Sequence, residues 1–358
     1  MARSFPHHEI LFELNPWLDD DCALPPVTVQ DPNSKWRMSS AWQKAIRRGD
    51  MDTALLMLAG LMQIDLSYVA SRIRVIAVED IGYADWQLVH VVEHVGRLPR
   101  VAFEARLRRA LVNATMAMVR SKKSRAVCDL SVASVYVPYY NGKEEPGGKL
   151  LADCVHVRKL LGGRMRALDG FPYLGEGMAN ADLHEYLKGT ALGKNDAWVT
   201  LTARLLNEKG GMYWMPAAWV SLADVSGALA DAETADDHAP PFTMIGAYPS
   251  YSFDKHCHDG KRALAYFRKA CPAIDATLAK WGIDDVDARN SMFNELIFIT
   301  ESAVLMNHVD ADLERRCLAI SNAKMFRPLT VVQVAALQDL LRENIDTLNK
   351  ARAKVIKL

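Results

Sequence analysis

Residues 40–62 read S-A-W-Q-K-A-I-R-R-G-D-M-D-T-A-L-L-M-L-A-G-L-M, and residues 68–85 read Y-V-A-S-R-I-R-V-I-A-V-E-D-I-G-Y-A-D. In both stretches the apolar residues recur at spacings of three and four. This periodicity predicts amphipathic helices, because residues three or four apart share one face of an α-helix. The positions expected to face a core are Ala54, Leu55, Leu58, Leu61 and Met62 in the first stretch and Val69, Ile73, Ile76 and Ala77 in the second.

Further helices are predicted by the same pattern elsewhere in the chain. Strand-like runs are few, so the expected fold class is mainly α. One long helix is expected to carry Phe103, Leu107, Ala110, Leu111, Ala114 and Met118. Two helices near the C-terminus are expected to carry Met292, Leu296, Ile299, Ala303 and Met306, and Val334, Leu337, Leu341, Ile345 and Leu348.

Residues 36–135, which contain both quoted stretches, resemble the C-terminal helical collar of the clamp-loader branch of the AAA+ ATPases, in particular the replication-associated recombination protein A and Werner-helicase-interacting group. The resemblance implies a helical bundle of a kind that supports oligomers and lies over DNA in its relatives. Residues 1–35 are expected to form an extended arm, and residues 136–358 a second, mostly helical region. The chain contains no G-x-x-x-x-G-K-[ST] motif, so no nucleoside triphosphate is expected as a ligand.

Charge is balanced in this chain of 358 residues, with 43 Lys and Arg against 43 Asp and Glu. A general binder of polyanions is expected to be basic, so any contact with DNA must come from local basic patches. Such patches are also common as solvated helix faces, and that alternative stays open here. The candidate patches are Arg106, Arg108 and Arg109, then Lys122, Lys123 and Arg125, and then Arg158, Lys159, Arg164 and Arg166.

The six cysteines are scattered without a C-x-x-C pair. Their spacing argues against a zinc ribbon and against a disulfide framework. Reduced thiols in a cytoplasmic protein are the simplest account. No apolar run reaches transmembrane length, so no membrane contact is expected.

The densest set of reactive side chains lies in Y-P-S-Y-S-F-D-K-H-C-H-D-G-K-R, residues 248–262. A helix that starts near Ser252 would place Asp254 and His258 four residues apart on one face. Asp254 is then the candidate general base or stabiliser of a cationic transition state, with His256 and His258 beside it. Around these three catalytic candidates, Tyr248 and Tyr251 are expected to stack on a base, and Lys255, Lys261 and Arg262 to hold phosphate.

Two other interpretations of this segment stand beside that one. In the first, Asp254 or Ser252 caps a helix and the histidines lie on the surface. In the second, four consecutive residues, 256–259, bind a metal ion. Adjacent residues rarely point at one ion and the sequence offers no second ligand cluster, so neither a metal nor another cofactor is expected.

Two further groups are candidates. Glu79 and Asp80 end a helix that is expected to be buried, where they serve either as secondary catalytic carboxylates or as partners of Arg72 in an ion pair that orders the helix junction. Lys194, Asn195 and Trp198 mark a helix start. That start is either an N-cap with a core tryptophan or a site for phosphate or a base.

The chain as a whole also resembles collar-derived antiphage DNA glycosylases, which remove glucosylated hydroxymethylcytosine from phage DNA. This resemblance implies an enzyme of antiviral defence that flips a modified cytosine out of double-stranded DNA and leaves an abasic site. Two alternatives stay open: a non-catalytic adaptor or oligomerisation protein of DNA replication and repair, and a transferase or metal nuclease. The enzyme hypothesis predicts Asp254 in a concave, basic-rimmed pocket beside another polar residue. The adaptor hypothesis predicts Asp254 exposed and without polar neighbours.

Overall fold

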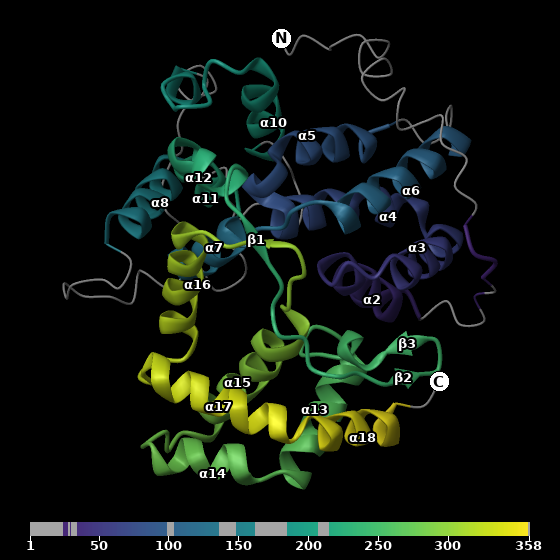
Figure 1. Ribbon diagram of the computed structural model, residues 1–358, viewed down its shortest axis with the longest axis vertical. Coiled ribbons are helices and arrows are strands. Elements are labelled where there is room, and N and C mark those ends of the chain that lie inside the picture. The colour runs from purple at the N-terminus through teal and green to yellow at the C-terminus, as the bar shows by residue number, and fades with distance from the viewer. Residues whose placement is uncertain are drawn as a thin grey trace. The chain divides into compact units, whose positions relative to one another are not determined.

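The structure is a computed structural model, shown in Figure 1. It describes residues 24–27, 29, 34–98, 104–135, 148–161, 185–206 and 215–356. These residues are mainly helical, with a few two-residue strands, and this confirms the predicted fold class. Most of the expected N-terminal arm lies outside the described residues, as do Arg164 and Arg166. No helix in the described ranges has the length and apolar character needed to cross a membrane.

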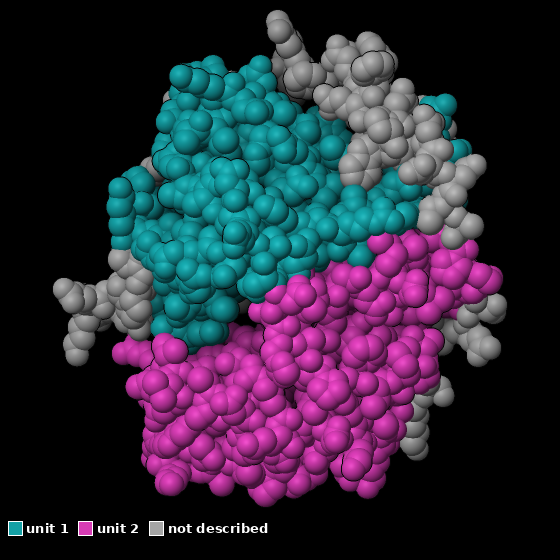
Figure 2. Space-filling model, in the orientation of Figure 1, with its two compact units in different colours: residues 1–21, 70–235, 307–324 teal, residues 22–69, 236–306, 325–358 magenta. Residues whose placement is uncertain are grey.

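The chain folds into two compact units, coloured separately in Figure 2. Unit 1 comprises residues 1–21, 70–235 and 307–324. Unit 2 comprises residues 22–69, 236–306 and 325–358. The collar-like range 36–135 therefore contributes to both units.

Unit 1 is built around tightly packed helices and a central aromatic group. The Tyr83 ring stacks on that of Trp219 at 4.3 Å, and Trp198 Nε1 donates a hydrogen bond to the Tyr83 hydroxyl. Strands β1 and β4 pair antiparallel, with Thr234 opposite Val309. The elements of the unit are α4 (Leu66–Ile76, which begins in unit 2), the π-helix η2 (Ala77–Ile81), the 3-10 helix η3 (Gly82–Asp85), α5 (Trp86–Val95), α6 (Glu104–Arg120), α7 (Ala126–Val135), α8 (Gly148–Leu161), α10 (Asp196–Leu206), α11 (Pro216–Ser221), η6 (Ala223–Val225), α12 (Gly227–Ala230), β1 (Thr234–Ala235), β4 (His308–Val309) and α16 (Asp312–Met325).

Unit 2 is also helical and carries a small antiparallel hairpin, β2–β3. Helix α2 packs on α3, and α13 packs on α18. Its elements are α2 (Lys35–Arg47), α3 (Met51–Ile64), β2 (Met244–Ile245), β3 (Tyr248–Pro249), the 3-10 helix η7 (Ser250–Ser252), α13 (His258–Ala270), α14 (Ala273–Lys280), α15 (Val286–Ile297), the π-helix η8 (Phe298–Ser302), α17 (Val331–Glu343) and α18 (Ile345–Val355).

Most of the predicted apolar positions are buried, whereas Leu55 and Ile299 are partly exposed and Phe103 lies outside the described residues. Leu58 in unit 2 and Ile73, Ile76 and Leu111 in unit 1 are fully buried. Burial of such side chains is the main favourable term in folding, about 1.5–3 kcal/mol for each large aliphatic group. The periodicity of the sequence therefore located the cores correctly.

Both C-terminal helices differ from expectation at their ends. The helix that begins at Val286 passes into η8 and ends at Ser302, so Ala303 and Met306 lie beyond it. The last predicted helix is two helices, α17 and α18. Asn344 separates them because its side-chain amide donates to the Leu340 carbonyl and caps the end of α17.

Candidate functional site

The candidate site in unit 2 is the connection between the β2–β3 hairpin and α13. Helix α13 begins at His258, and Cys257 is its N-cap residue. The backbone of Cys257 is extended, and its sulfur accepts a hydrogen bond from Gly260 N. The expectation that a helix starting near Ser252 pairs Asp254 with His258 is therefore wrong. The capping alternative is wrong in its cap, because neither Ser252 nor Asp254 caps α13, but it is right that His256 and His258 lie on the surface.

Gly260 allows this connection to close tightly against α13. A Cβ atom at this position would lie 2.0 Å from the backbone oxygen of Asp254 and 2.6 Å from its nitrogen. Real Cβ atoms do not approach backbone atoms so closely, so only glycine fits here. The first turn of α13 thereby holds the Asp254 backbone in place.

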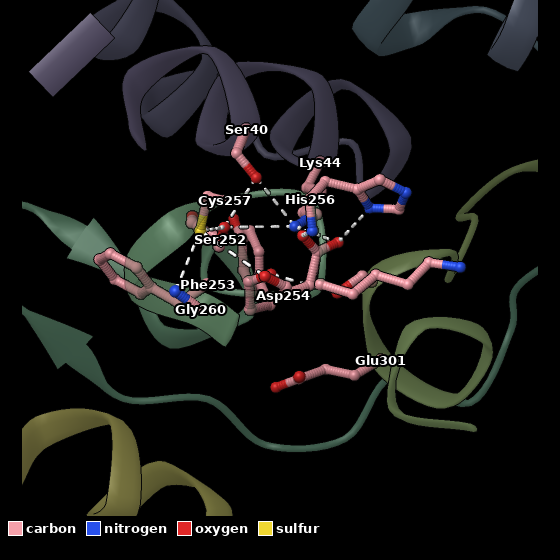
Figure 3. Close-up of polar contacts among 12 residues, drawn as sticks. Ser40, Lys44, Ser252, Phe253, Asp254, His256, Cys257, Gly260 and Glu301 are labelled. Carbon is pink, nitrogen blue, oxygen red and sulfur yellow. Dashed lines mark hydrogen bonds and ion pairs between the residues drawn. The ribbon is translucent and has the colours of Figure 1, made fainter. Parts of the chain in front are cut away.

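Asp254 is fully buried, and its carboxylate is surrounded by donors (Figure 3). The backbone N–H of His256 donates to Oδ1 at 2.9 Å, and His256 Nδ1 lies 3.2 Å from Oδ2. Lys44 Nζ lies 2.8 Å from the same Oδ2 atom. The polar neighbour expected beside Asp254 is thus present as His256, while Lys44 was not among the candidate site residues.

Lys44 comes from α2 and is itself buried. Besides Asp254, its ammonium group donates to Ser40 Oγ at 2.9 Å and to the Ser252 carbonyl at 3.3 Å. The sequence held one signal for it: Lys44 follows Ala41 by three residues and so falls on an apolar helix face. A lysine on a buried face needs a partner for its charge, and here that partner is Asp254.

Burial and ion pairing shift the pKa values of Lys44 and Asp254 in opposite directions. Burial lowers the pKa of Lys44, and the Asp254 carboxylate counteracts part of that effect. Burial alone would raise the pKa of Asp254, but Lys44 and His256 outweigh it, so the net pKa lies below the ordinary value. Burial raises the pKa of the neighbouring Cys257 thiol. The site therefore combines an ionised carboxylate, an amine with a weakened hold on its proton and a protonated thiol.

A second ion pair supports the same connection. Arg352 of α18 and Glu301 of η8 are fully buried and form two parallel hydrogen bonds of 2.8 and 2.6 Å. Arg352 Nε also donates to the Phe253 carbonyl at 3.0 Å. Bidentate pairs of this kind fix geometry as well as charge, so the residue before Asp254 is anchored firmly.

The tyrosines of the segment are buried, in contrast to the base-stacking role expected of them. Tyr251 is fully covered: Arg48 lies 4.2 Å from its ring centroid, and its hydroxyl donates to Asp50 at 3.3 Å. Tyr248 packs edge-on against Phe253. Their apolar rings therefore support the hairpin, and neither offers an open ring face of the kind a base stacks on.

The cations around the site are more accessible. His258, Lys261 and Arg262 are exposed on the first turns of α13, where Arg262 lies 3.9 Å from Asp259. Lys255 is partly exposed and forms an ion pair with Glu295. Their predicted role as phosphate contacts stays a prediction.

In unit 1, the expected basic patch at residues 122–125 is turned inward. Lys123 is fully buried and donates to the carbonyls of Val119 and Ser121, the end of α6. Lys122 donates to the carbonyls of Ala230 and Ala232. Both amines donate to backbone carbonyls that lack an intrahelical partner near the ends of helices. This argues against the DNA-contact role expected for them.

Arg125 and the collar carboxylates form one buried cluster. Arg125 Nη1 lies 3.2 Å from Asp80 and 3.8 Å from Glu79. Arg125 thus forms an ion pair at the helix junction, and the expected pair with Arg72 stays a prediction. Because both Arg125 and Asp80 are buried, the cluster orders the junction between η2 and α7, and this argues against a phosphate contact for Arg125 and against catalysis by Glu79 or Asp80.

The cluster includes a further carboxylate, Glu314, which the sequence did not single out. It accepts hydrogen bonds from Ser124 Oγ and Arg125 N, both at 2.6 Å. Burial raises the pKa of Glu314 to about 7. The segment between α6 and α7 is thus held by a group that titrates near neutral pH.

The start of α10 is structural in this chain. Asn195 Oδ1 accepts from Trp198 N, as an N-cap does, and Trp198 is fully buried in the aromatic group of unit 1. The N-cap alternative is therefore confirmed, and the stacking role for Trp198 is not supported. Lys194, just before the cap, is exposed. Within the residues that the structure describes, no group of three or more His, Cys, Asp or Glu side chains is arranged to hold a metal ion.

Comparison with known proteins yields one partial similarity. The chain is 39% identical over 100 residues to the replication-associated recombination protein A of Bacillus subtilis (strain 168). The match covers 27% of this chain and 23% of that protein, so the chain spans about a quarter of its curated relative. No protein-family model matches the chain, and no solved structure matches it. The similarity supports the relationship to clamp-loader-type AAA+ proteins; it does not bear on the resemblance to antiphage glycosylases.

Proposed function

We propose that this chain is a DNA glycosylase that excises a hypermodified base, of the glucosylated hydroxymethylcytosine type, from phage DNA and leaves an abasic site in antiviral defence. The observation that carries the proposal is the ionised Asp254 carboxylate in the interior of unit 2, in contact with both Lys44 and His256. The partial similarity to a replication-associated recombination protein supports the broader role in DNA metabolism.

The chemistry needs such a carboxylate. Cleavage of an N-glycosidic bond passes through a sugar with oxocarbenium character, and a fixed negative charge near C1′ stabilises it. A group held by several donors in the interior needs little reorganisation when that charge develops. The target nucleotide must leave the duplex to reach it, because a stacked base hides its sugar from a side chain.

In this proposal, access to the carboxylate would run past His256. The side chain of this residue is 58% exposed, whereas Asp254 and Lys44 are buried. Its ring meets Phe298 edge-on at 4.9 Å, and its Nδ1 atom lies 3.2 Å from Asp254 Oδ2. Displacement of this one exposed ring by an extruded nucleotide would uncover the carboxylate, while Lys261 and Arg262 on α13 would hold the flanking phosphates.

A non-catalytic adaptor is the second candidate, favoured by the similarity to the recombination protein. That hypothesis predicts an exposed Asp254 without polar neighbours. The residue is instead fully buried and bound by Lys44 and His256. The burial of Asp254 contradicts the exposed residue that the adaptor hypothesis predicts, and the concave pocket that the enzyme hypothesis predicts stays a prediction.

The test is incubation of the whole chain with phage DNA that carries glucosylated hydroxymethylcytosine and, in parallel, with unmodified DNA of the same sequence. Alkali then cleaves the strand wherever a base has been removed, and a denaturing gel displays the breaks. We expect alkali-sensitive breaks in the modified DNA alone. DNA binding without breaks in either substrate would favour the adaptor.

A further inference from the structure

Trp36, in the first turn of α2, is a large aromatic residue with most of its surface exposed. The residue is 62% exposed, although a tryptophan stabilises a fold mainly where its ring is covered. Its ring meets Tyr68 edge-on at 5.6 Å, and the Tyr68 hydroxyl forms a hydrogen bond of 2.7 Å with Ser39 Oγ. Tryptophan is enriched among the side chains that carry binding energy, so an exposed ring beside an anchored tyrosine indicates a contact surface.

A lysine lies against both of these rings. Lys35 Nζ is 5.6 Å from the centroid of the Trp36 ring and 4.2 Å from that of Tyr68, and it forms an ion pair with Asp65 at 2.7 Å. Aromatic rings next to cations are the combination with which proteins bind nucleic acids, because the rings stack on bases and the cations attract phosphates.

Arg37 joins this end of α2 to the start of α13. Its Nε donates to Asp259 Oδ2 at 2.6 Å, and the other oxygen of Asp259 lies 3.9 Å from Nη1 of the exposed Arg262. Lys261, also exposed, precedes Arg262 on the same helix. The exposed ring of Trp36 and the proposed phosphate contacts are therefore linked by one chain of ion pairs within unit 2.

Helix α2 also connects Trp36 with the proposed active site. Trp36, Ser40 and Lys44 recur every four residues, so they follow one face of the helix. Figure 3 shows the two inner residues: Ser40 Oγ donates to the Ser252 carbonyl at 2.7 Å. Lys44 Nζ lies 2.8 Å from Asp254 Oδ2. At a rise of 1.5 Å per residue, Trp36 and Lys44 are about 12 Å apart along the helix axis.

We infer that Trp36 inserts into the duplex beside the extruded nucleotide and stacks on the bases left behind. The inference rests on the proposed glycosylase function and adds a DNA contact to it. Apolar side chains that enter a base step unstack it, and an aromatic ring stacks on bases of any sequence. Trp36 has the accessible ring that Tyr251 lacks, and the ring would stabilise the extruded state while the sugar reaches Asp254.

The experiment compares the binding of the whole chain to two labelled duplexes of one sequence, one intact and one with a single abasic site, at several salt concentrations. The abasic duplex lacks one base, and an inserted ring can take its place. Trp36→Ala should weaken binding to the abasic duplex by about tenfold, the effect of losing one aromatic–base stack. The slope of log affinity against log salt should not change, because a stacked ring releases no counterions.

Two further variants make the result specific. Trp36→Phe keeps an aromatic ring and should restore part of the lost affinity. Tyr266→Ala removes another exposed ring that has a lysine beside it, Lys354 at 4.9 Å, and should bind both duplexes like the parent chain. The midpoint of denaturant unfolding should be the same in Trp36→Ala as in the parent, since the side chain is mostly exposed.

The outcomes separate this contact from the proposed reaction. Parent affinity of Trp36→Ala for the abasic duplex, in a chain that releases bases from glucosylated phage DNA, overturns the inserted ring alone and leaves a partner protein to cover this surface. Equal weakening on the intact and the abasic duplex overturns insertion as well. The expected loss of affinity without base release from that DNA would leave the Trp36 contact standing and overturn the proposed substrate instead.

Discussion

Lys44 Nζ lies 2.8 Å from Asp254 Oδ2, and both side chains are buried within unit 2. This ion pair joins α2 to the connection between β3 and α13, two segments far apart in the sequence. Each residue neutralises a charge that would otherwise be isolated in the interior, where isolated charges are costly. Folding and the proposed chemistry thus depend on the same two groups.

Replacement of Asp254 by Asn should therefore affect stability as well as activity. The variant leaves the Lys44 charge buried without its counter-ion, which typically costs ~3–5 kcal/mol of unfolding free energy. Turnover should fall by ~10²-fold or more, as for loss of a general base or electrostatic stabiliser. Denaturant unfolding and the alkali assay measure the two effects.

The exposed Asp284→Asn is the control for that variant and should change unfolding free energy by less than about 0.5 kcal/mol. The double variant Lys44→Met with Asp254→Leu removes both charges. It should cost less than the two single variants added together, because it leaves no isolated charge. Additive costs would mean that the two residues do not interact.

Leu58→Ala tests the core of unit 2. The side chain is fully buried in α3, so its truncation should lower unfolding free energy by ~2–5 kcal/mol. Val332→Ala removes a methyl-bearing side chain that is 78% exposed and should shift stability by less than about 0.5 kcal/mol. Equal effects of the two variants in denaturant titrations would show that the apolar face of α3 has been assigned wrongly.

Gly260→Ala tests the close approach of α13 to the site. Its Cβ would meet the backbone of Asp254 at 2.0 Å, so the turn must move and the Lys44–Asp254 pair with it. We expect a loss of ~1–3 kcal/mol, as for other overpacked positions, together with reduced turnover. Gly227→Ala is matched to it, because a Cβ there meets nothing within 4 Å. That control should be neutral or stabilising, by up to about 1 kcal/mol.

Glu314 should make stability depend on pH near neutrality. Its pKa is about 7 in the folded chain against 4.5 for the free group, so the folded state binds the proton more tightly. This group therefore stabilises the fold fully below pH 4.5, and its contribution is lost as pH rises through 7. Glu314→Gln, which cannot ionise, should flatten the fall in unfolding free energy between about pH 5 and pH 8. The exposed Glu343→Gln should keep the parent profile, and an unchanged profile in Glu314→Gln would contradict the assignment.

The double variant Lys261→Ala and Arg262→Ala tests the DNA surface. These exposed cations should bind phosphates, and removal of each cation–phosphate interaction lowers the slope of log affinity against log salt by about 0.9. Lys123→Ala should leave that slope unchanged and reduce stability instead, since its amine is buried against the end of α6. Titration of a labelled duplex at several salt concentrations separates the two. A reduced slope in Lys123→Ala would mean that this side chain leaves its buried position to bind DNA.

The local sequence pattern was sufficient to predict which residues are buried and where one helix starts. The spacing of Leu58, Ile73, Ile76 and Leu111 predicted their burial, and Asn195 before Trp198 predicted a capped helix start. Both properties depend on residues within one or two helical turns, so they can be read along the chain. The Asp254 block was also recognised as a dense polar cluster, although the start of its helix was misplaced by several residues.

Long-range contacts could not be read in the same way. Lys44, the partner of Asp254, and Glu314, the acceptor for Ser124 and Arg125, come from distant parts of the sequence. The same is true of Lys123, whose charge suggested a surface patch but whose amine closes the end of a helix. The sequence by itself determined which residues are apolar, which cap helices and which carry charge. Only the tertiary structure decided which charges are buried and what they pair with, because a buried charge is stabilised by whatever group the fold brings within a few ångströms, however far away that group lies along the chain.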